Sequence, residues 1–219
     1  MKKGKRKVTV LTERGEIPLI VDVDRRLWEG GTINGKRVNT FIDPSYAAWR
    51  NMFDRAYKMK DTRPGYEFTT VCDSWFTFSN FDTWYQEHNV EGFVLDKDLV
   101  LEGNTVYCPE YCRFVPPYVN TLLSFSKRTE RKYLLGAHVR KGDGKIYAKA
   151  SGSKSKHLGY FATEEEAHFA WLKDKAKSIK ETAERYKQED HFCKDVYKTL
   201  VNKSDFYYNL AETKTVFRG

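Results

Sequence analysis

Residues 134–186 read LLGAHVRKGDGKIYAKASGSKSKHLGYFATEEEAHFAWLKDKAKSIKETAERY, and this stretch decides the fold of the C-terminal half. Three β-prone runs separated by turns rich in Gly, Ser and Asp predict strands at 134–139, 145–150 and 156–161. A long helix is expected next, because Thr163 and Glu166 form a capping box. Apolar residues then recur at steps of three and four: Phe169, Leu172, Ala176, Ile179, Ala183 and Tyr186. Such a helix covers one face of a small sheet and leaves the other face free.

The free face of this predicted sheet is basic. Residues 131–161 carry eight Lys or Arg residues and a single acid, Asp143, within a chain of formal net charge +8. Such an excess favours a polyanionic partner. The cations expected on the face and its loops are Arg140, Lys141, Lys145, Lys149, Lys154 and Lys156, interleaved with His138, Tyr147 and His157. We expect this sheet to contact phosphates and base edges of double-stranded DNA. A solvated basic sheet without a partner is the alternative.

Two segments of this region, GAHVRKGDGKIYAKA and KHLGYFATEEEAHFAW, carry a family resemblance. Residues 131–187 resemble the DNA-binding domain named after the plant floral regulator Apetala-two, which also occurs in endonucleases of phages and mobile elements. The most specific part is LGYF followed by TEEEA and an aromatic residue. The resemblance implies a three-stranded sheet set in the major groove. It implies that the residues facing DNA are His138, Arg140, Lys145, Tyr147, Lys149 and His157.

The N-terminal region predicts a small antiparallel piece followed by two amphipathic helices. Short β-prone runs at 7–11, 17–23 and 37–41 are separated by turns that contain Gly15, and Gly30, Gly31 and Gly35. One helix is expected after Asp43-Pro44 and another from 74 to 88. Aromatic residues line one face of each helix and are expected to form core: Tyr46, Trp49, Phe53, Tyr57, Phe78, Phe81, Trp84 and Tyr85.

A β-β-α unit is predicted between residues 93 and 125. Strands at 93–99 and 105–108 flank a Gly103-Asn104 turn, and Pro116-Pro117 opens a helix. Such a unit can hold a divalent ion between a carboxylate that ends its first strand and an amide on its helix. Asp96 and Asn120 stand at those places. The alternative is an ordinary strand exit followed by a turn.

The stretch FVLDKDLVLEGNTVYCPEYCRFVPPYVNTLL, residues 93–123, resembles the HNH endonucleases, most closely phage proteins that join this unit to the domain described above. The segments YAAWRNMFDRAY and VCDSWFTFSNFDTW are similar to the helical lead-in of that group. The resemblance implies that Asp96 and Asn120 hold Mg²⁺ or Mn²⁺, while Lys97 occupies the position of the general-base histidine. Either Asp98 replaces that base, or the unit is a scaffold without activity. Asn104 is expected to tighten the loop.

These patterns predict an α+β protein with four parts. They are an HNH-like nuclease domain (1–123), a linker (124–133), the Apetala-two-like domain (134–187) and a helical tail (188–219). The four cysteines, Cys72, Cys108, Cys112 and Cys193, lack a second close-spaced ligand pair, so buried free thiols are favoured over a structural zinc site. No signal-peptide pattern and no apolar run near the roughly 20 residues of a membrane span is present. A cytoplasmic protein of a phage-infected bacterial host is expected.

The leading hypothesis is therefore a free-standing phage homing endonuclease that hydrolyses phosphodiesters of duplex DNA with a divalent metal. A site-specific DNA-binding regulator that descends from such an enzyme is the second hypothesis. A third is a protein that binds RNA or coats DNA without sequence preference.

Overall fold

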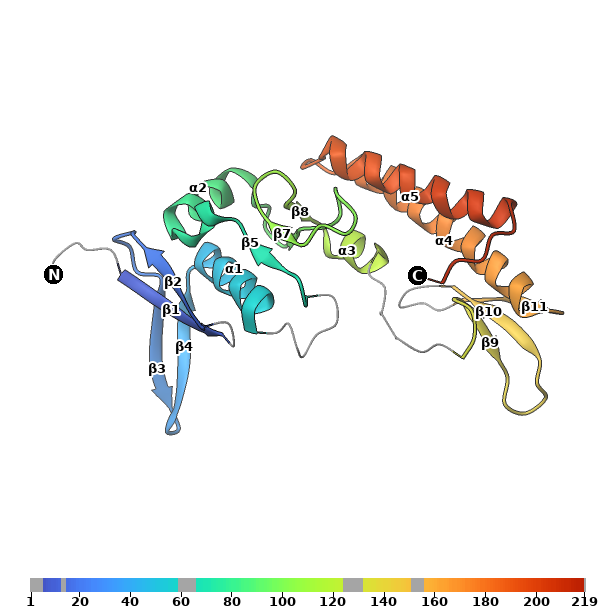
Figure 1. The fold of residues 1–219 in the computed structure, drawn as a ribbon, viewed down its shortest axis with the longest axis horizontal. Helices are drawn as coiled ribbons and strands as arrows, with labels where there is room; N and C mark the ends of the chain where they lie inside the picture. Colours follow the sequence, from blue (N-terminus) through green and yellow to red (C-terminus); the bar gives the residue numbers. More distant parts are fainter. Residues whose placement is uncertain (1–5, 13–14, 59–65, 124–131, 151–155, 219) are drawn as a thin grey trace. The chain divides into compact units, whose positions relative to one another are not determined.

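The computed structural model describes residues 6–12, 15–58, 66–123, 132–150 and 156–218. Its elements are a mixture of helices and small sheets, as the predicted α+β class requires (Figure 1). The chain forms two compact units, Met1–Phe114 and Val115–Gly219. The division falls before the expected domain end at 123, and most of the predicted linker lies outside the described residues. No helix in the described ranges combines the length and apolarity needed to cross a membrane.

The first unit contains short strands around an aromatic helical core. Its elements are β1 (Arg6–Thr12), β2 (Gly15–Val21), β3 (Trp28–Ile33), β4 (Lys36–Ile42), α1 (Pro44–Phe53), the π-helix η1 (Asp54–Lys58), β5 (Thr70–Val71), the 3₁₀-helix η2 (Asp73–Phe76), α2 (Phe78–His88), β6 (Val94–Asp96), β7 (Val106–Tyr107) and β8 (Arg113–Val115). β1 pairs antiparallel with β2, and β3 pairs antiparallel with β4. The predicted turn at Gly30 and Gly31 is wrong, because β3 runs through both glycines with a bulge after Glu29.

The aromatic stripes of α1 and α2 form the core of this unit, as predicted. Trp49 packs 5.3 Å from Phe53 and 5.2 Å from Phe78, measured between ring centroids, and all three residues are buried. The indole nitrogen of Trp49 donates to the carbonyl of Trp75 at 2.7 Å. Its one polar atom is therefore satisfied inside an apolar cluster, as a buried tryptophan requires.

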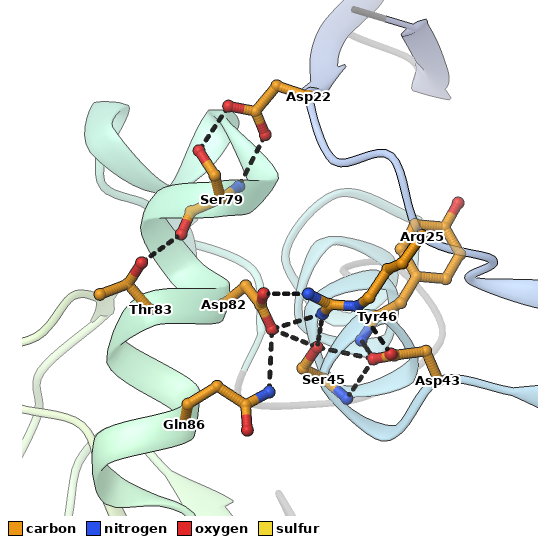
Figure 2. Close-up of polar contacts among 9 residues, drawn as sticks. All are labelled: Asp22, Arg25, Asp43, Ser45, Tyr46, Ser79, Asp82, Thr83 and Gln86. Carbon is orange, nitrogen blue, oxygen red and sulfur yellow. Dashed lines mark hydrogen bonds and ion pairs between the residues drawn. The ribbon is translucent and has the colours of Figure 1, made fainter. Parts of the chain in front are cut away.

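A polar network fastens the segment after β2 to both helices (Figure 2). The guanidinium of Arg25 donates to both carboxylate oxygens of Asp82 on α2, at 2.6 and 2.7 Å, and to Asp43 at 3.0 Å. Asp43 also caps α1 by accepting from the backbone N–H groups of Ser45 and Tyr46. Arg25 thus ties the segment after the N-terminal strands to the helical core, and Asp22 adds a second tie by accepting from the backbone N–H of Ser79 on α2 at 2.9 Å.

We expect Asp82→Asn to lower the free energy of unfolding at pH 7 by about 1–2 kcal/mol, allowing for solvent screening at the half-exposed Arg25. Burial raises the pKa of Asp82, but hydrogen bonds from Arg25, Ser45 and Gln86 outweigh burial and bring it below its ordinary value. A depressed carboxyl pKa stabilises the fold above the unfolded pKa of about 3.9 and loses that contribution as pH falls below it. Urea unfolding at pH 7 and pH 3 should therefore show a smaller pH dependence for Asp82→Asn than for the unmodified protein. Glu87→Gln, an exposed carboxylate on the same helix, is the control; equal pH dependence in both variants would contradict the assignment.

The strand pairing predicted for the β-β-α unit is wrong. β6 pairs with β8, whereas β7, the predicted partner, pairs in parallel with β5. β8 ends at Val115, immediately before the helix opened by Pro117. Asp96 is the last residue of β6, and the helix opened by Pro117 belongs to the second unit.

The second unit is a three-stranded antiparallel sheet that packs on a helical pair. Its elements are α3 (Pro117–Leu123), β9 (Ala137–Val139), β10 (Ile146–Lys149), β11 (His157–Phe161), α4 (Glu164–Tyr186) and α5 (Lys194–Glu212). β10 is the central strand. The predicted capping box is confirmed, since Thr163 accepts from the Glu166 N–H at 3.1 Å while the Glu166 carboxylate accepts from the Thr163 N–H. The predicted helical series in the tail is α5, which lies along α4 and buries Val196 and Leu200 (Figure 1).

One buried histidine connects both ends of this unit. His168 on α4 donates from Nδ1 to the carbonyl of Leu135, at 2.8 Å, and accepts at Nε2 from the backbone N–H of Phe217, at 3.0 Å. Burial lowers the pKa of His168, which keeps the ring neutral and able to accept. The Phe217 ring lies 5.6 Å from that of Tyr207. The segment after α5 is therefore held against α4 and the strand side of the unit.

Candidate functional site

The sheet of the second unit has one apolar face, which α4 covers. Ala137 on β9 and Ala148 on β10 are buried against Ala167 of α4. Ile146, Leu158 and Phe161 pack around them. Because successive side chains in a strand alternate between faces, this packing directs the intervening side chains away from α4.

The outer face carries a row of rings. Tyr147 on the central strand lies between His138 and His157, with ring centroids 5.3 and 5.6 Å away and interplanar angles of 24° and 15°. Tyr160 lies 4.8 Å from His157. Rings stacked side by side make a flat surface with hydrogen-bonding groups at its edges.

Three cations border this row of rings. The Arg140 guanidinium lies 5.3 Å above the Tyr160 ring, and the Lys145 ammonium lies 5.9 Å from it. The Lys149 ammonium lies 5.7 Å from the Tyr147 ring. Cations near the ring faces are held by the quadrupole of the aromatic ring, so the positive charge stays at the sheet surface. We call the seven residues of this surface the outer sheet face: His138, Arg140, Lys145, Tyr147, Lys149, His157 and Tyr160.

Arg140 is positioned by the tight turn that follows it. Its guanidinium makes a two-pronged ion pair with Asp143 and donates to the Tyr160 hydroxyl at 2.9 Å. The Gly144 N–H donates to the Arg140 carbonyl at 3.0 Å, which closes the turn. Asp143, the single acid of this basic segment, thus orients an arginine of the outer sheet face.

The structure brings together most of the residues that the sequence predicted for DNA binding. Six of the eight lie on the outer sheet face, while Lys141 and Lys156 are exposed beside it. Lys154 lies outside the described residues. Tyr160 is the member that the sequence reasoning missed. β10 and β11 shift register between Ala148 and Lys149, so His157 and Tyr160 share a face although they are three residues apart.

His138 titrates under the influence of its neighbours. Burial and the nearby Lys149 ammonium lower the pKa of His138 below its ordinary value. The ring is therefore neutral at pH 7 and offers one donor and one acceptor nitrogen. A neutral imidazole beside a tyrosine hydroxyl can hydrogen-bond base edges as well as phosphate oxygens.

Asp96, the predicted metal ligand of the first unit, ends β6 and caps the turn that follows. Its Oδ1 accepts from the backbone N–H groups of Asp98, at 3.0 Å, and Leu99, at 2.8 Å. Burial and the adjacent Asp98 carboxylate raise the pKa of Asp96 to about 6. Two carboxylates thus lie close enough on one turn to disfavour each other's negative charge.

Lys97 and Asn104 hold the loop behind this turn. The buried Lys97 ammonium donates to the Asn104 carbonyl at 2.9 Å and to Asp98 Oδ2 at 3.1 Å. The Asn104 amide donates to the carbonyls of Lys97 and Val106, at 2.6 and 2.8 Å, and accepts from the Val106 N–H. The prediction that Asn104 tightens the loop is confirmed. The Lys97 ammonium is here a structural donor, with its protons directed at oxygens of the loop.

Asn120, the second predicted ligand, lies on α3 in the second unit. Side chains from the middle and the C-terminal end of α4, and from the turn after it, hold this helix. The Tyr118 hydroxyl donates to Glu189 at 2.8 Å, the Arg185 guanidinium lies 3.9 Å above the Tyr118 ring, and the Lys175 ammonium donates to the Leu122 carbonyl. The helix that carries Asn120 is therefore part of the same unit as the outer sheet face.

The cysteines are free thiols. Cys108 and Cys112 are buried, and Cys72 and Cys193 are half-buried. Burial raises the pKa of Cys112 well above its ordinary value, which keeps that thiol protonated. Within the described residues, no group of three or more His, Cys, Asp or Glu side chains is arranged to hold a metal ion.

Comparisons of the chain with protein-family models, with curated proteins and with solved structures found no match.

Proposed function

We propose that this protein binds duplex DNA through the outer sheet face. The observation that carries the proposal is the two-sidedness of the sheet: α4 covers one face with apolar contacts, and the other face displays stacked rings bordered by cations. A monomeric soluble domain has no structural need for such a row of aromatic side chains on its uncovered face.

The chemistry of the outer sheet face fits a nucleic acid in two ways. Arg140, Lys145 and Lys149 supply charge that phosphates neutralise, with release of counterions. Arg140 is held in place by Asp143 and Tyr160, and a fixed guanidinium fork suits the two acceptors of a guanine edge. The major groove of a duplex is wide enough for a small β-ribbon. Duplex DNA is therefore the partner that uses both the charge and the geometry.

A metal-dependent hydrolysis of DNA at Asp96 is the second candidate function. The observation that favours it is the pair of close carboxylates, Asp96 and Asp98, on the turn after β6, with the pKa of Asp96 raised to about 6. A divalent cation relieves such repulsion, and carboxylate oxygens are the ligands that Mg²⁺ and Mn²⁺ prefer. Asp96 would hold the ion. The ion would polarise a phosphate oxygen and acidify bound water. Lys97 is not assigned as the base, because its ammonium is occupied with Asn104 and Asp98.

The double variant Arg140→Ala/Lys149→Ala tests the outer sheet face. Its affinity for a pool of duplex DNA should fall by about 30-fold or more, since each lost contact of this kind costs about 1–3 kcal/mol. The slope of log affinity against log salt should fall by up to about 1.8, because each phosphate contact contributes about 0.9. Fluorescence anisotropy at several salt concentrations measures both quantities.

The matched control is Lys177→Ala/Lys180→Ala, which removes the same charge from exposed positions of α4. It should leave most of the affinity and the slope unchanged. If both double variants lost the same affinity, net charge alone would explain binding and the proposal would fail. Competition with duplex RNA tests whether binding is specific to DNA. If RNA competed as well as DNA, the partner would be any duplex nucleic acid.

A further inference from the structure

The hairpin of β3 and β4 displays apolar side chains that the described residues of the first unit leave exposed. Trp28 is 54% exposed and Ile33 is 59% exposed, and Phe41 and Ile42 are also exposed. The hairpin projects from the rest of its unit (Figure 1). Asn34 and Gly35 form its two-residue turn with φ angles of 52° and 75°, the type I′ conformation that suits the twist of a hairpin. The ribbon is therefore well formed and still presents large apolar groups to its surroundings.

The tip of this hairpin is cationic. Lys36 and Arg37 are exposed, and no acid occurs between residues 33 and 37. Glu29, the single acid of the two strands, pairs with Arg26 at 2.8 Å near the other end of the ribbon. Apolar Ile33 thus lies beside two positive side chains at the far end of a two-stranded ribbon.

We propose that the β3–β4 hairpin is a second DNA contact, with its tip in the major groove. This inference rests on the proposed binding of duplex DNA and adds a binding site in the first unit. The major groove admits a two-stranded β-ribbon. Lys36 and Arg37 pair with phosphates, and Ile33 packs on apolar groups of the base edges, such as a thymine methyl.

Charge favours DNA over a second copy of the chain as the occupant of this surface. A symmetric contact between two hairpin tips would bring Lys36 and Arg37 of both copies together, and like charges at an interface are repulsive. A phosphate backbone neutralises the same side chains. Because the outer sheet face lies in the other unit, one chain then holds DNA at two places, and the second contact gains from the effective concentration set by the first.

The test compares the unmodified full chain with the hairpin variant Lys36→Ala/Arg37→Ala, with Ile33→Ser, with Arg140→Ala/Lys149→Ala, and with the control Lys177→Ala/Lys180→Ala. The hairpin variant should bind duplex DNA about 10-fold more weakly, with a salt slope lower by about 1.8. Hydroxyl-radical footprinting should show that it protects a shorter stretch of DNA than the unmodified protein. Ile33→Ser should weaken binding with the salt slope unchanged. Near-UV circular dichroism checks the fold, and Lys36→Gln/Arg37→Gln serves if the alanine variant is perturbed.

The outcomes separate the two proposals. If the hairpin variant kept its salt slope and footprint while the Arg140→Ala/Lys149→Ala variant lost DNA affinity, the hairpin contact would be overturned and the outer sheet face upheld. If only the hairpin variant lost DNA affinity, the hairpin contact would be upheld and the proposed contact at the outer sheet face overturned. If light scattering showed a dimer that Ile33→Ser dissociates, with no change in DNA binding, the hairpin would be an interface between copies. Absence of salt-dependent binding by the unmodified protein would overturn both proposals.

Discussion

Gly136→Ala is expected to destabilise the second unit by about 2–5 kcal/mol, enough to lower its melting temperature by on the order of 10 °C. Gly136 has a φ of 78°, and a Cβ added there would lie 2.0 Å from a side-chain atom of Trp171 on α4. Neither the backbone nor the buried indole can move without opening the contact between the sheet and α4. Differential scanning calorimetry of the full chain measures the shift. DNA affinity should fall in parallel, because the same contact orients the outer sheet face.

Gly144→Ala is the matched control for this prediction. Gly144 has a φ of 71°, but an added Cβ would meet no atom within 4 Å. It isolates the backbone cost of roughly 1–2 kcal/mol for a non-glycine residue in this conformation. Equal shifts in the two variants would mean that the indole gives way and that the close approach costs nothing.

Asp96→Ala is expected to abolish metal-dependent nicking of supercoiled DNA while DNA affinity stays the same. The loss should exceed the roughly 10–100-fold that follows removal of an outer-shell partner of a metal site, because Asp96 is assigned as a direct ligand. The assay incubates the protein with plasmid or phage DNA and Mg²⁺ or Mn²⁺, with a chelator as the reference.

Two further variants serve as a control and as a test of Lys97. Glu91→Ala removes an exposed carboxylate from the same unit and should nick normally. Lys97→Met keeps the aliphatic stem but removes the ammonium that donates to Asn104. Lys97→Met should lower the melting temperature and leave the pH dependence of the nicking rate unchanged. If Lys97 were the general base, this variant would change that pH dependence. If the unmodified protein nicks no DNA with either metal yet binds tightly, the β-β-α unit is a scaffold and the protein is a DNA-binding regulator.

The C-terminal sheet and its helix were predictable because their signals are local. β-prone runs between turn residues, a capping box, and steps of three and four along α4 all lie within short windows of sequence. Tyr160 was missed because the resemblance does not imply it, and because strand propensity does not reveal the register shift beside Lys149 that brings it to the same face as His157. A register shift of one residue moves a side chain to the other face of a sheet.

The first unit was harder to predict because its pairings join distant parts of the chain. β6, β7 and β8 are three residues long or shorter, and strands of that length carry almost no periodic signal. β7 lies nearer to β6 in sequence than β8 does, yet β7 pairs with β5 and β8 pairs with β6. The ties from Arg25 to Asp43 and Asp82 likewise depend on tertiary placement and leave no mark in the local sequence.

The tie between His168 and Phe217 has a consequence for biogenesis. During translation, the first unit has all of its chain once Phe114 has left the ribosome, so it can fold while synthesis continues. The ring of His168 meets its second partner only after Phe217 emerges. The second unit is therefore completed late, and a ribosome that stalls within α5 would present a folded first unit beside an unfinished second one.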